Sequence, residues 1–193
     1  MNVNEILNEK GIFKNAVKSA LVGAALATTS NPLAHADQIV KPSTEVKSSS
    51  QVYNEYISML KRHEGVRLKA YKDHLGHPTI GYGHKILPGE DFSKGITAQQ
   101  ASTMLTNDAM DAYRSALQLM NQRGVKRNET LMRVLPNMVF QMGKRGVSKF
   151  NKMWDALAVG DYNEAAKEML DSTWAKQTPS RAKELANLVR SIK

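Results

Sequence analysis

The feature that most constrains the fold is a change of pattern at Gly65, which divides a helical segment from a glycine-rich one. Before Gly65, apolar side chains recur at helical spacing and serines are available as N-caps, so we expect a helix that ends at Gly65. The apolar positions of this helix are Val52, Tyr56, Ile57 and Leu60. After it, residues 66–84 carry short β-prone runs around a Gly/Pro turn, which predicts a hairpin or a small sheet.

Helical signals follow from residue 97 onward. Residues 97–100 (Thr-Ala-Gln-Gln) form a capping box, and an amphipathic pattern predicts a long helix from there to about Gln122. Gly124 is expected to end this helix. Asn128 is placed to cap a further helix, in which Pro136 should produce a kink.

Three shorter helices are expected after that. Residues 154–159 predict a helix that ends at Gly160, and Asp161 is expected to cap the next one. Pro179 should begin the last helix, where its missing N–H costs nothing. The chain is therefore predicted to be an α+β protein, mostly helical, with a small β lobe, a long connecting helix and a C-terminal helical lobe.

The first 36 residues have the layout of a targeting segment. Lysines at positions 10, 14 and 18 precede a short apolar run at 19–27, and residues 34–36 (Ala-His-Ala) offer the small residues of a cleavage site. The apolar run is far shorter than the roughly 18 residues that span a membrane. We therefore expect a secretory signal cleaved after Ala36, a polar linker at 37–50 and a folded domain at 51–193. Two glutamates among the first ten residues leave open an amphipathic helix or a propeptide.

The net charge of +9 belongs mainly to the expected domain. Residues 1–36 hold three lysines and two glutamates, so the remainder keeps 24 basic and 16 acidic residues, a net charge of +8. Such a charge predicts a polyanionic partner: nucleic acid, an anionic membrane or an acidic cell-wall polymer. A solvated basic surface without a dedicated partner is the alternative. The chain has no cysteine, which excludes disulfides and thiolate metal sites.

Residues 63–84 concentrate the chemistry of the chain. Glu64 would stand at the C-terminal end of the predicted helix, where the helix dipole disfavours a negative charge, as suits an acid that must keep its proton. Asp73, in a polar turn, should stay ionised, and the hydroxyl of Thr79 on a predicted strand could hold a water. Hydrolysis of a glycosidic bond needs such an acid and such a carboxylate. Two carboxylates nine residues apart are nevertheless often only surface charges.

The histidines of the same stretch suggest a rival interpretation. His74 and His77 have a plausible ligand spacing, with His63, Asp73 and His84 nearby in sequence. A zinc-dependent amidase or peptidase of the cell wall would use such ligands with a glutamate base. Because the H-E-x-x-H pattern is missing, we expect no metal site.

Three motifs closely resemble those of the T-even-type phage lysozymes, muramidases of the phage-type glycoside hydrolase family. The residues that carry the resemblance are Glu64-Gly65-x-Arg67-Leu68-x-x-Tyr71-x-Asp73-x-x-Gly76-x-x-Thr79-Ile80-Gly81-x-Gly83-His84, then residues 137–143 (NMVFQMG), and finally Trp174 with Gln177-Thr178-Pro179-x-Arg181-Ala182. The first motif matches without gaps, and the resemblance covers roughly residues 52–193 in the right order. It implies a lysozyme-like two-lobed fold and identifies 51–193 as a lysozyme catalytic domain.

The resemblance also implies a reaction. Glu64 would be the general acid, and Asp73 and Thr79 would position the attacking water. The bond cleaved would be the β-1,4 bond between N-acetylmuramic acid and N-acetylglucosamine in peptidoglycan, with inversion, which needs a wide carboxylate gap. No cofactor is implied, and we expect a monomer without a stable membrane span.

Supporting roles follow from the same resemblance. His84 would pair with Asp108 on the connecting helix, and Arg181 would face Glu64. Three neighbouring residues would line the substrate cleft: Phe140, Gln141 and Met142. Trp174 is expected in the core.

The chain departs from the family pattern in ways that bear on its role. The region from His84 to Ile96 is shorter than in the T-even enzymes, and Pro136 interrupts a helix that normally runs through. An export signal is foreign to the T-even type. We therefore predict an endolysin exported to the host periplasm, where its basic surface holds it on the wall.

Three alternatives stay open at this point. They are a virion-associated lysozyme with a cleaved propeptide, a non-catalytic peptidoglycan-binding protein and a nucleic-acid binder. The last is the least favoured, because the chain lacks interleaved aromatic and basic residues.

Overall fold

The computed structural model describes residues 47–73 and 76–193. Contacts within the chain separate residues 1–50 from residues 51–193, and the second unit holds nearly every element that the structure describes. The predicted signal at 1–36 lies outside the described residues, as do most of the predicted linker and His74.

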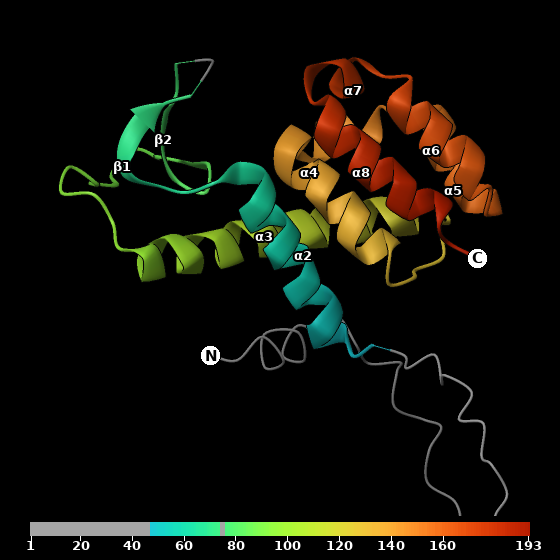
Figure 1. Ribbon diagram of the computed structural model, residues 1–193, viewed down its shortest axis with the longest axis horizontal. Helices are drawn as coiled ribbons and strands as arrows, with labels where there is room; N and C mark the ends of the chain where they lie inside the picture. The colour runs from blue at the N-terminus through green and yellow to red at the C-terminus, as the bar shows by residue number, and fades with distance from the viewer. Residues whose placement is uncertain (1–46, 74–75) are drawn as a thin grey trace, which may run out of the picture. The chain divides into compact units, whose positions relative to one another are not determined.

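The described part of the chain contains three strands and seven helices (Figure 1). In chain order they are α2 (Ser49–Glu64), β1 (Arg67–Lys72), β2 (Pro78–Gly81), β3 (His84–Lys85), α3 (Ala98–Gln122), α4 (Leu131–Ser148), α5 (Asn151–Val159), α6 (Tyr162–Leu170), α7 (Thr173–Gln177) and α8 (Pro179–Arg190). The mostly helical α+β fold predicted from the sequence is confirmed. No helix in these ranges is both long and apolar enough to cross a membrane.

The β lobe is a three-stranded antiparallel sheet in the order β1-β2-β3. Tyr71 of β1 lies opposite Thr79 of β2, which in turn lies opposite Lys85 of β3. The central strand β2 is buried from Thr79 to Gly81, so this short strand supplies the sheet's packing face. The hairpin predicted over residues 66–84 is therefore confirmed.

Helix α3 connects the β lobe to the helical lobe, which consists of α4–α8. It contacts β2 and β3 as well as α4, and Figure 1 shows it running from the sheet toward the other helices. Its start is fixed by a capping box: Thr97 Oγ1 accepts a hydrogen bond from the Gln100 N–H (3.1 Å), and Gln100 Oε1 accepts one from the Thr97 N–H (2.8 Å). The predicted connecting helix and its cap are thus confirmed.

Buried tyrosines fasten α2, the helix that ends in Glu64, to its neighbours. The rings of Tyr53, Tyr56 and Tyr113 pack together with centroids 5.4–6.0 Å apart. The Tyr56 hydroxyl lies 3.3 Å from the carbonyl oxygen of Ala109 in α3 and 3.4 Å from that of Pro136 in α4. Because buried hydroxyls need such acceptors, these contacts fix the position of α2 against both helices.

Helix α4 changes direction at a different residue from the one predicted. Its backbone keeps helical angles through Pro136, whereas Gly143 has φ 72° and ψ 161°. A residue with a side chain rarely adopts that positive φ, so glycine is required at this break. The expected interruption of the helix therefore lies seven residues beyond the proline, and Gln141 stands in the turn just before it.

The short helices of the helical lobe largely follow their sequence signals. Gly160 ends α5 in a left-handed conformation, the Asp161 side chain caps α6, and Pro179 opens α8. Two details differ from the prediction. Helix α5 begins at Asn151 rather than at residue 154, and the five-residue helix α7 was not predicted because it is too short to show a period.

Candidate active site

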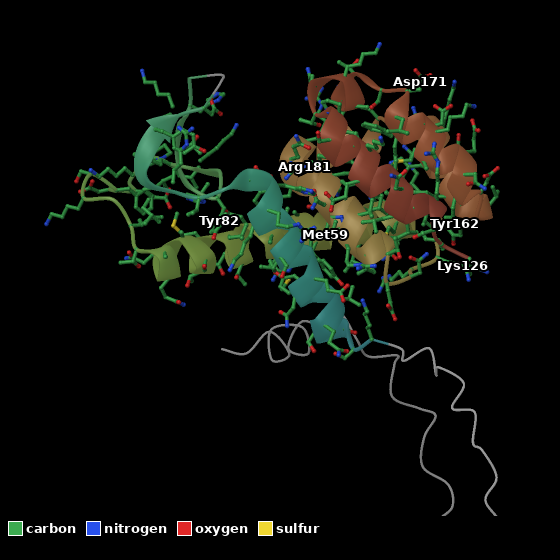
Figure 2. The ribbon with its side chains drawn as sticks, in the orientation of Figure 1. Met59, Tyr82, Lys126, Tyr162, Asp171 and Arg181 are labelled. Carbon is green, nitrogen blue, oxygen red and sulfur yellow. The ribbon has the colours of Figure 1, made fainter. Side chains whose placement is uncertain are left out.

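Glu64 is the last residue of α2 and is held by an arginine from the far end of the domain. Arg181 Nη2 lies 2.6 Å from Glu64 Oε1, with the arginine side chain only 8% exposed and that of the glutamate 21% exposed. Figure 2 shows Arg181 between α8 and α2. The arginine expected to face Glu64 therefore does so.

The second carboxylate oxygen of Glu64 has different surroundings. No hydrogen-bond donor among the described residues reaches Oε2, and a Cβ built on Gly83 would lie 3.8 Å from it. Gly83 also has φ +89°, which a residue with a side chain rarely adopts. The turn after β2 thus brings bare backbone close to the acidic side chain.

Asp73 follows β1 and is fixed by the turn that it opens. Its Oδ1 accepts a hydrogen bond from the His77 N–H at 2.8 Å, and its Oδ2 lies 3.2 Å from His77 Nδ1. Its own N–H donates to the His77 carbonyl oxygen at 2.9 Å. These contacts hold the carboxylate in one orientation, in the way that Asx turns do.

Thr79 lies on β2, next to the same turn. The residue is 3% exposed, and its hydroxyl donates to the His77 carbonyl oxygen at 3.0 Å. Since the hydroxyl proton is used in this bond, the lone pairs of Oγ1 are left to accept a hydrogen bond. His77, which was considered as a metal ligand, instead organises Asp73 and Thr79.

His84 is bound by carboxylates on both ring nitrogens. Nδ1 lies 2.8 Å from Asp108 Oδ2, the partner expected on α3, and Nε2 lies 3.2 Å from Glu90 Oε2. Burial lowers the pKa of His84, but the hydrogen bonds and charges of Asp108 and Glu90 raise it by more, so the net shift is upward. Sequence reasoning missed Glu90, because nothing in the shortened loop marks it as a partner.

The histidines do not assemble a metal centre in the described ranges. There, no group of three or more metal-ligating side chains comes together. His63 bonds Asn137 and Glu184, while His77 and His84 bond their own carboxylates. The zinc interpretation therefore gains no support from these residues.

The three predicted cleft residues line two different hollows. Gln141 and Met142 border a cleft of about 870 Å³ in the helical lobe, together with Lys149, Phe150 and Trp174. Phe140 borders a second hollow of about 430 Å³ that also includes Gly83 and His84. Phe140 thus lies beside the residues that follow β2, whereas Gln141 and Met142 line the hollow of the helical lobe.

Trp174 is buried, as expected, and it orients Gln141. Its Nε1 donates to Gln141 Oε1 at 2.7 Å, and its ring meets Phe150 edge to face. Because the amide oxygen accepts from the indole, the amide nitrogen is the group through which Gln141 could donate to a ligand in the cleft that it lines.

Comparison with known proteins agrees with this architecture. Residues 61–191 match the family model of phage lysozymes. The chain is 31% identical over 211 residues to the pre-baseplate central spike protein Gp5 of Enterobacteria phage T4, and 32% identical over 147 residues to probable T4-type lysozyme 2 of Dictyostelium discoideum. It is also 37% identical over 100 residues to an endolysin of Salmonella phage P22.

The extent of each match differs. The match to the spike protein covers 97% of this chain but 36% of that protein, so the chain spans about a third of that relative's length. The Dictyostelium lysozyme match covers 64% of this chain and 86% of the relative, and the endolysin match 49% and 64%. With the family model matched over most of the domain, the chain belongs to the phage lysozyme family, the T4-type lysozymes.

Proposed function

We propose that this lysozyme is a muramidase that cleaves the β-1,4 bond between N-acetylmuramic acid and N-acetylglucosamine. Glu64 protonates the leaving oxygen, and Asp73 with Thr79 holds the attacking water. The reaction inverts the anomeric centre, because the water and the acid act from opposite faces of the sugar.

The unequal surroundings of the two Glu64 oxygens carry the proposal. Arg181 donates to Oε1, so the negative charge of the carboxylate is favoured on that atom. A proton on Glu64 is therefore best placed on Oε2, which lies toward Gly83 and is faced by no donor from the described residues. A general acid needs a proton on the oxygen that can reach the leaving group.

The turn from Asp73 to Thr79 supports the water-binding half of the mechanism. Both residues are anchored on His77, and both carry oxygen atoms that can accept a hydrogen bond from water. A water that donates one hydrogen bond to each residue keeps an oxygen lone pair directed at the anomeric carbon. Asp73 then acts as the base and Thr79 as the second anchor.

The test is a digest of purified peptidoglycan by wild type and by Glu64→Gln, with products reduced by borohydride and weighed by mass spectrometry. We expect new reducible muramic-acid ends with wild type only, and NMR of fresh product should give the inverted anomer. Chelation with EDTA should leave the rate unchanged. Freed peptides with intact glycan would contradict the muramidase assignment, and loss of activity with EDTA would point to a metal enzyme.

The endolysin role is supported by the export-like pattern of residues 1–36 and by the endolysin match. We expect the chain to reach the host periplasm and to act there in host lysis. The corresponding measurement is N-terminal sequencing of the periplasmic protein, which should begin at Asp37. A chain that stays in the cytoplasm with Met1 retained would contradict export.

One observation favours a second role, as a lysozyme carried by the phage particle. The match to the spike protein covers 97% of the chain, so it includes most of the residues before 51, which the family model does not reach. Mass spectrometry of purified particles discriminates the two roles. Peptides of this chain in the particle would support the virion role, and their absence from particles of an expressing phage would support the endolysin.

A further inference from the structure

The last turn of α2 contacts α8 through three consecutive residues. Arg62 Nη2 lies 3.0 Å from Glu184 Oε1, and His63 Nε2 lies 3.0 Å from Glu184 Oε2. The third contact is the one between Glu64 and Arg181. Arg181 and Glu184 are three positions apart on α8, so they stand side by side on one helix face. Helix α8 therefore contacts the end of α2 through two side chains of opposite charge.

The contact through His63 is the rigid one. Its side chain is 9% exposed, whereas that of Arg62 is 59% exposed. Nδ1 of His63 lies 3.3 Å from Oδ1 and 3.2 Å from Nδ2 of Asn137, a fully buried residue of α4. With both ring nitrogens occupied, the imidazole cannot rotate without losing a partner.

The contact survives a change in the charge of His63. When the ring is neutral, Nε2–H donates to Glu184 and Nδ1 accepts from the Asn137 amide nitrogen. When the ring is protonated, Nε2–H still donates to Glu184, and Nδ1–H donates to the Asn137 amide oxygen after the amide turns over. The carboxylate of Glu184 is thus an acceptor in either state.

The end of α2 is held by few backbone hydrogen bonds, so side-chain contacts decide its position. The last carbonyl groups of a helix have no partners within it, and helix ends fray. The backbone closure after Glu64 is a single long bond, from the Gly65 N–H to the Lys61 carbonyl oxygen at 3.3 Å. Since His63 and Glu64 are neighbours, any rotation of this turn moves both side chains together.

We propose that Glu184 is a positioning residue of this lysozyme, which holds the last turn of α2 through His63 so that Glu64 stays aimed at the scissile bond. The inference rests on the proposed role of Glu64 as the general acid. Glu184 touches no reacting atom, and it acts by fixing the helix end that carries the acid. A displacement of a catalytic group by about 1 Å can reduce the rate substantially.

The experiment compares Glu184→Gln and His63→Gln with wild type on soluble glycan strands prepared by removing the peptides from peptidoglycan. Circular dichroism gives the folded fraction, and kcat is calculated per folded enzyme. We expect kcat to fall about tenfold with KM within about twofold of wild type, because the acid is misplaced while the binding surface is intact. The double variant should lose no more than the worse single variant, because both remove one contact.

The matched control is Arg133→Gln, which removes the ion pair between α4 and Glu55 in the first half of α2. It joins the same helix to the body of the domain, away from the catalytic end, so stability should fall while kcat is retained. A wild-type kcat in folded Glu184→Gln and His63→Gln would overturn the inference, as would an equal loss in the control. The proposed function is judged separately by the peptidoglycan digest, in which it fails if wild type makes no muramic-acid ends or if Glu64→Gln makes them as well.

Discussion

His84 and Asp108 join the sheet to the connecting helix through a hydrogen bond of 2.8 Å. Because the pKa of His84 is raised above 6.5 in the folded protein, the pair contributes stability that is fully present below pH 6.5. That stability is lost as pH rises through the folded pKa. Burial raises the pKa of Asp108, and His84 offsets part of this rise. Wild type and variant should therefore be compared at pH values at which Asp108 is ionised.

We therefore predict that Asp108→Asn lowers the free energy of unfolding by about 1 kcal/mol below pH 6.5 and by less above it, a magnitude discounted for solvent screening. Urea unfolding at a series of pH values from about pH 5 measures this difference. Asp111→Asn is the control, because Asp111 is exposed on the same helix and pairs with Arg114. Parallel stability curves for wild type and Asp108→Asn would refute the prediction.

The buried Arg181 should matter for both activity and stability. Arg181→Met leaves Glu64 without its charged partner, so we expect unfolding free energy to fall by about 2 kcal/mol and kcat to fall at least tenfold. Chemical unfolding and turnover on soluble glycan strands give the two quantities. The exposed Lys183→Met on α8 is the control and should change neither. A wild-type kcat in Arg181→Met would show that Glu64 keeps its orientation without the arginine.

Trp174 is expected to affect substrate binding through Gln141. Trp174→Phe keeps an aromatic ring beside Phe150 but removes the donor to Gln141 Oε1, which leaves the amide free to turn. We predict a several-fold higher KM with kcat nearly unchanged, and a loss of about 1–2 kcal/mol in stability. Trp154→Phe, which removes a buried indole donor to the Val147 carbonyl oxygen away from the cleft, should destabilise without the same rise in KM. Equal KM values in the two variants would argue against an oriented amide.

Gly95 is a position where a side chain has no room. A Cβ there would lie 2.7 Å from the carbonyl oxygen of Leu68, which already accepts a hydrogen bond from the Ile96 N–H at 2.8 Å. Gly95→Ala should therefore displace the loop from β1 and lower the free energy of unfolding by about 2 kcal/mol, which lowers the melting temperature by several degrees. Gly89→Ala isolates the clash, because Gly89 has a similar φ with open space around it. Equal melting temperatures would show that the loop absorbs the extra atom.

Local signals in the sequence predicted most of the fold because the side chains that set helix ends act on their own backbone. Thr97 with Gln100, Gly160 and Asp161 each bond or turn the chain within four residues, so their positions can be inferred without the tertiary structure. The break in α4 was misplaced for a related reason. A proline restricts its own φ to a helical value, whereas the glycine seven residues later permits an angle that other residues avoid.

The predicted site residues came from the family motifs, and the contacts that hold them were only partly foreseen. Arg181 was expected as a partner because it lies at a matching motif position, and Asp108 because the family pairs the histidine with an aspartate on the connecting helix. Glu90 and Glu184 were missed, since their partners are 6 and 121 positions away and no local pattern marks either residue. The His63–Glu184 pair depends on how α2 and α8 pack, and the His84–Glu90 pair on how the loop after β3 turns back, and the spacing of residues within one element encodes neither.

The 117 positions between Glu64 and Arg181 have a consequence for synthesis of the enzyme. A nascent chain that has not yet released α8 from the ribosome holds every residue of the acid-bearing helix and the sheet, yet lacks the side chain that binds the acid. Residues from the two sides of the site meet only after nearly the whole domain has left the exit tunnel and folded. We therefore expect full hydrolytic activity only after this helix has docked, so a chain that ends before α8 should lack the partner that holds the acid in place.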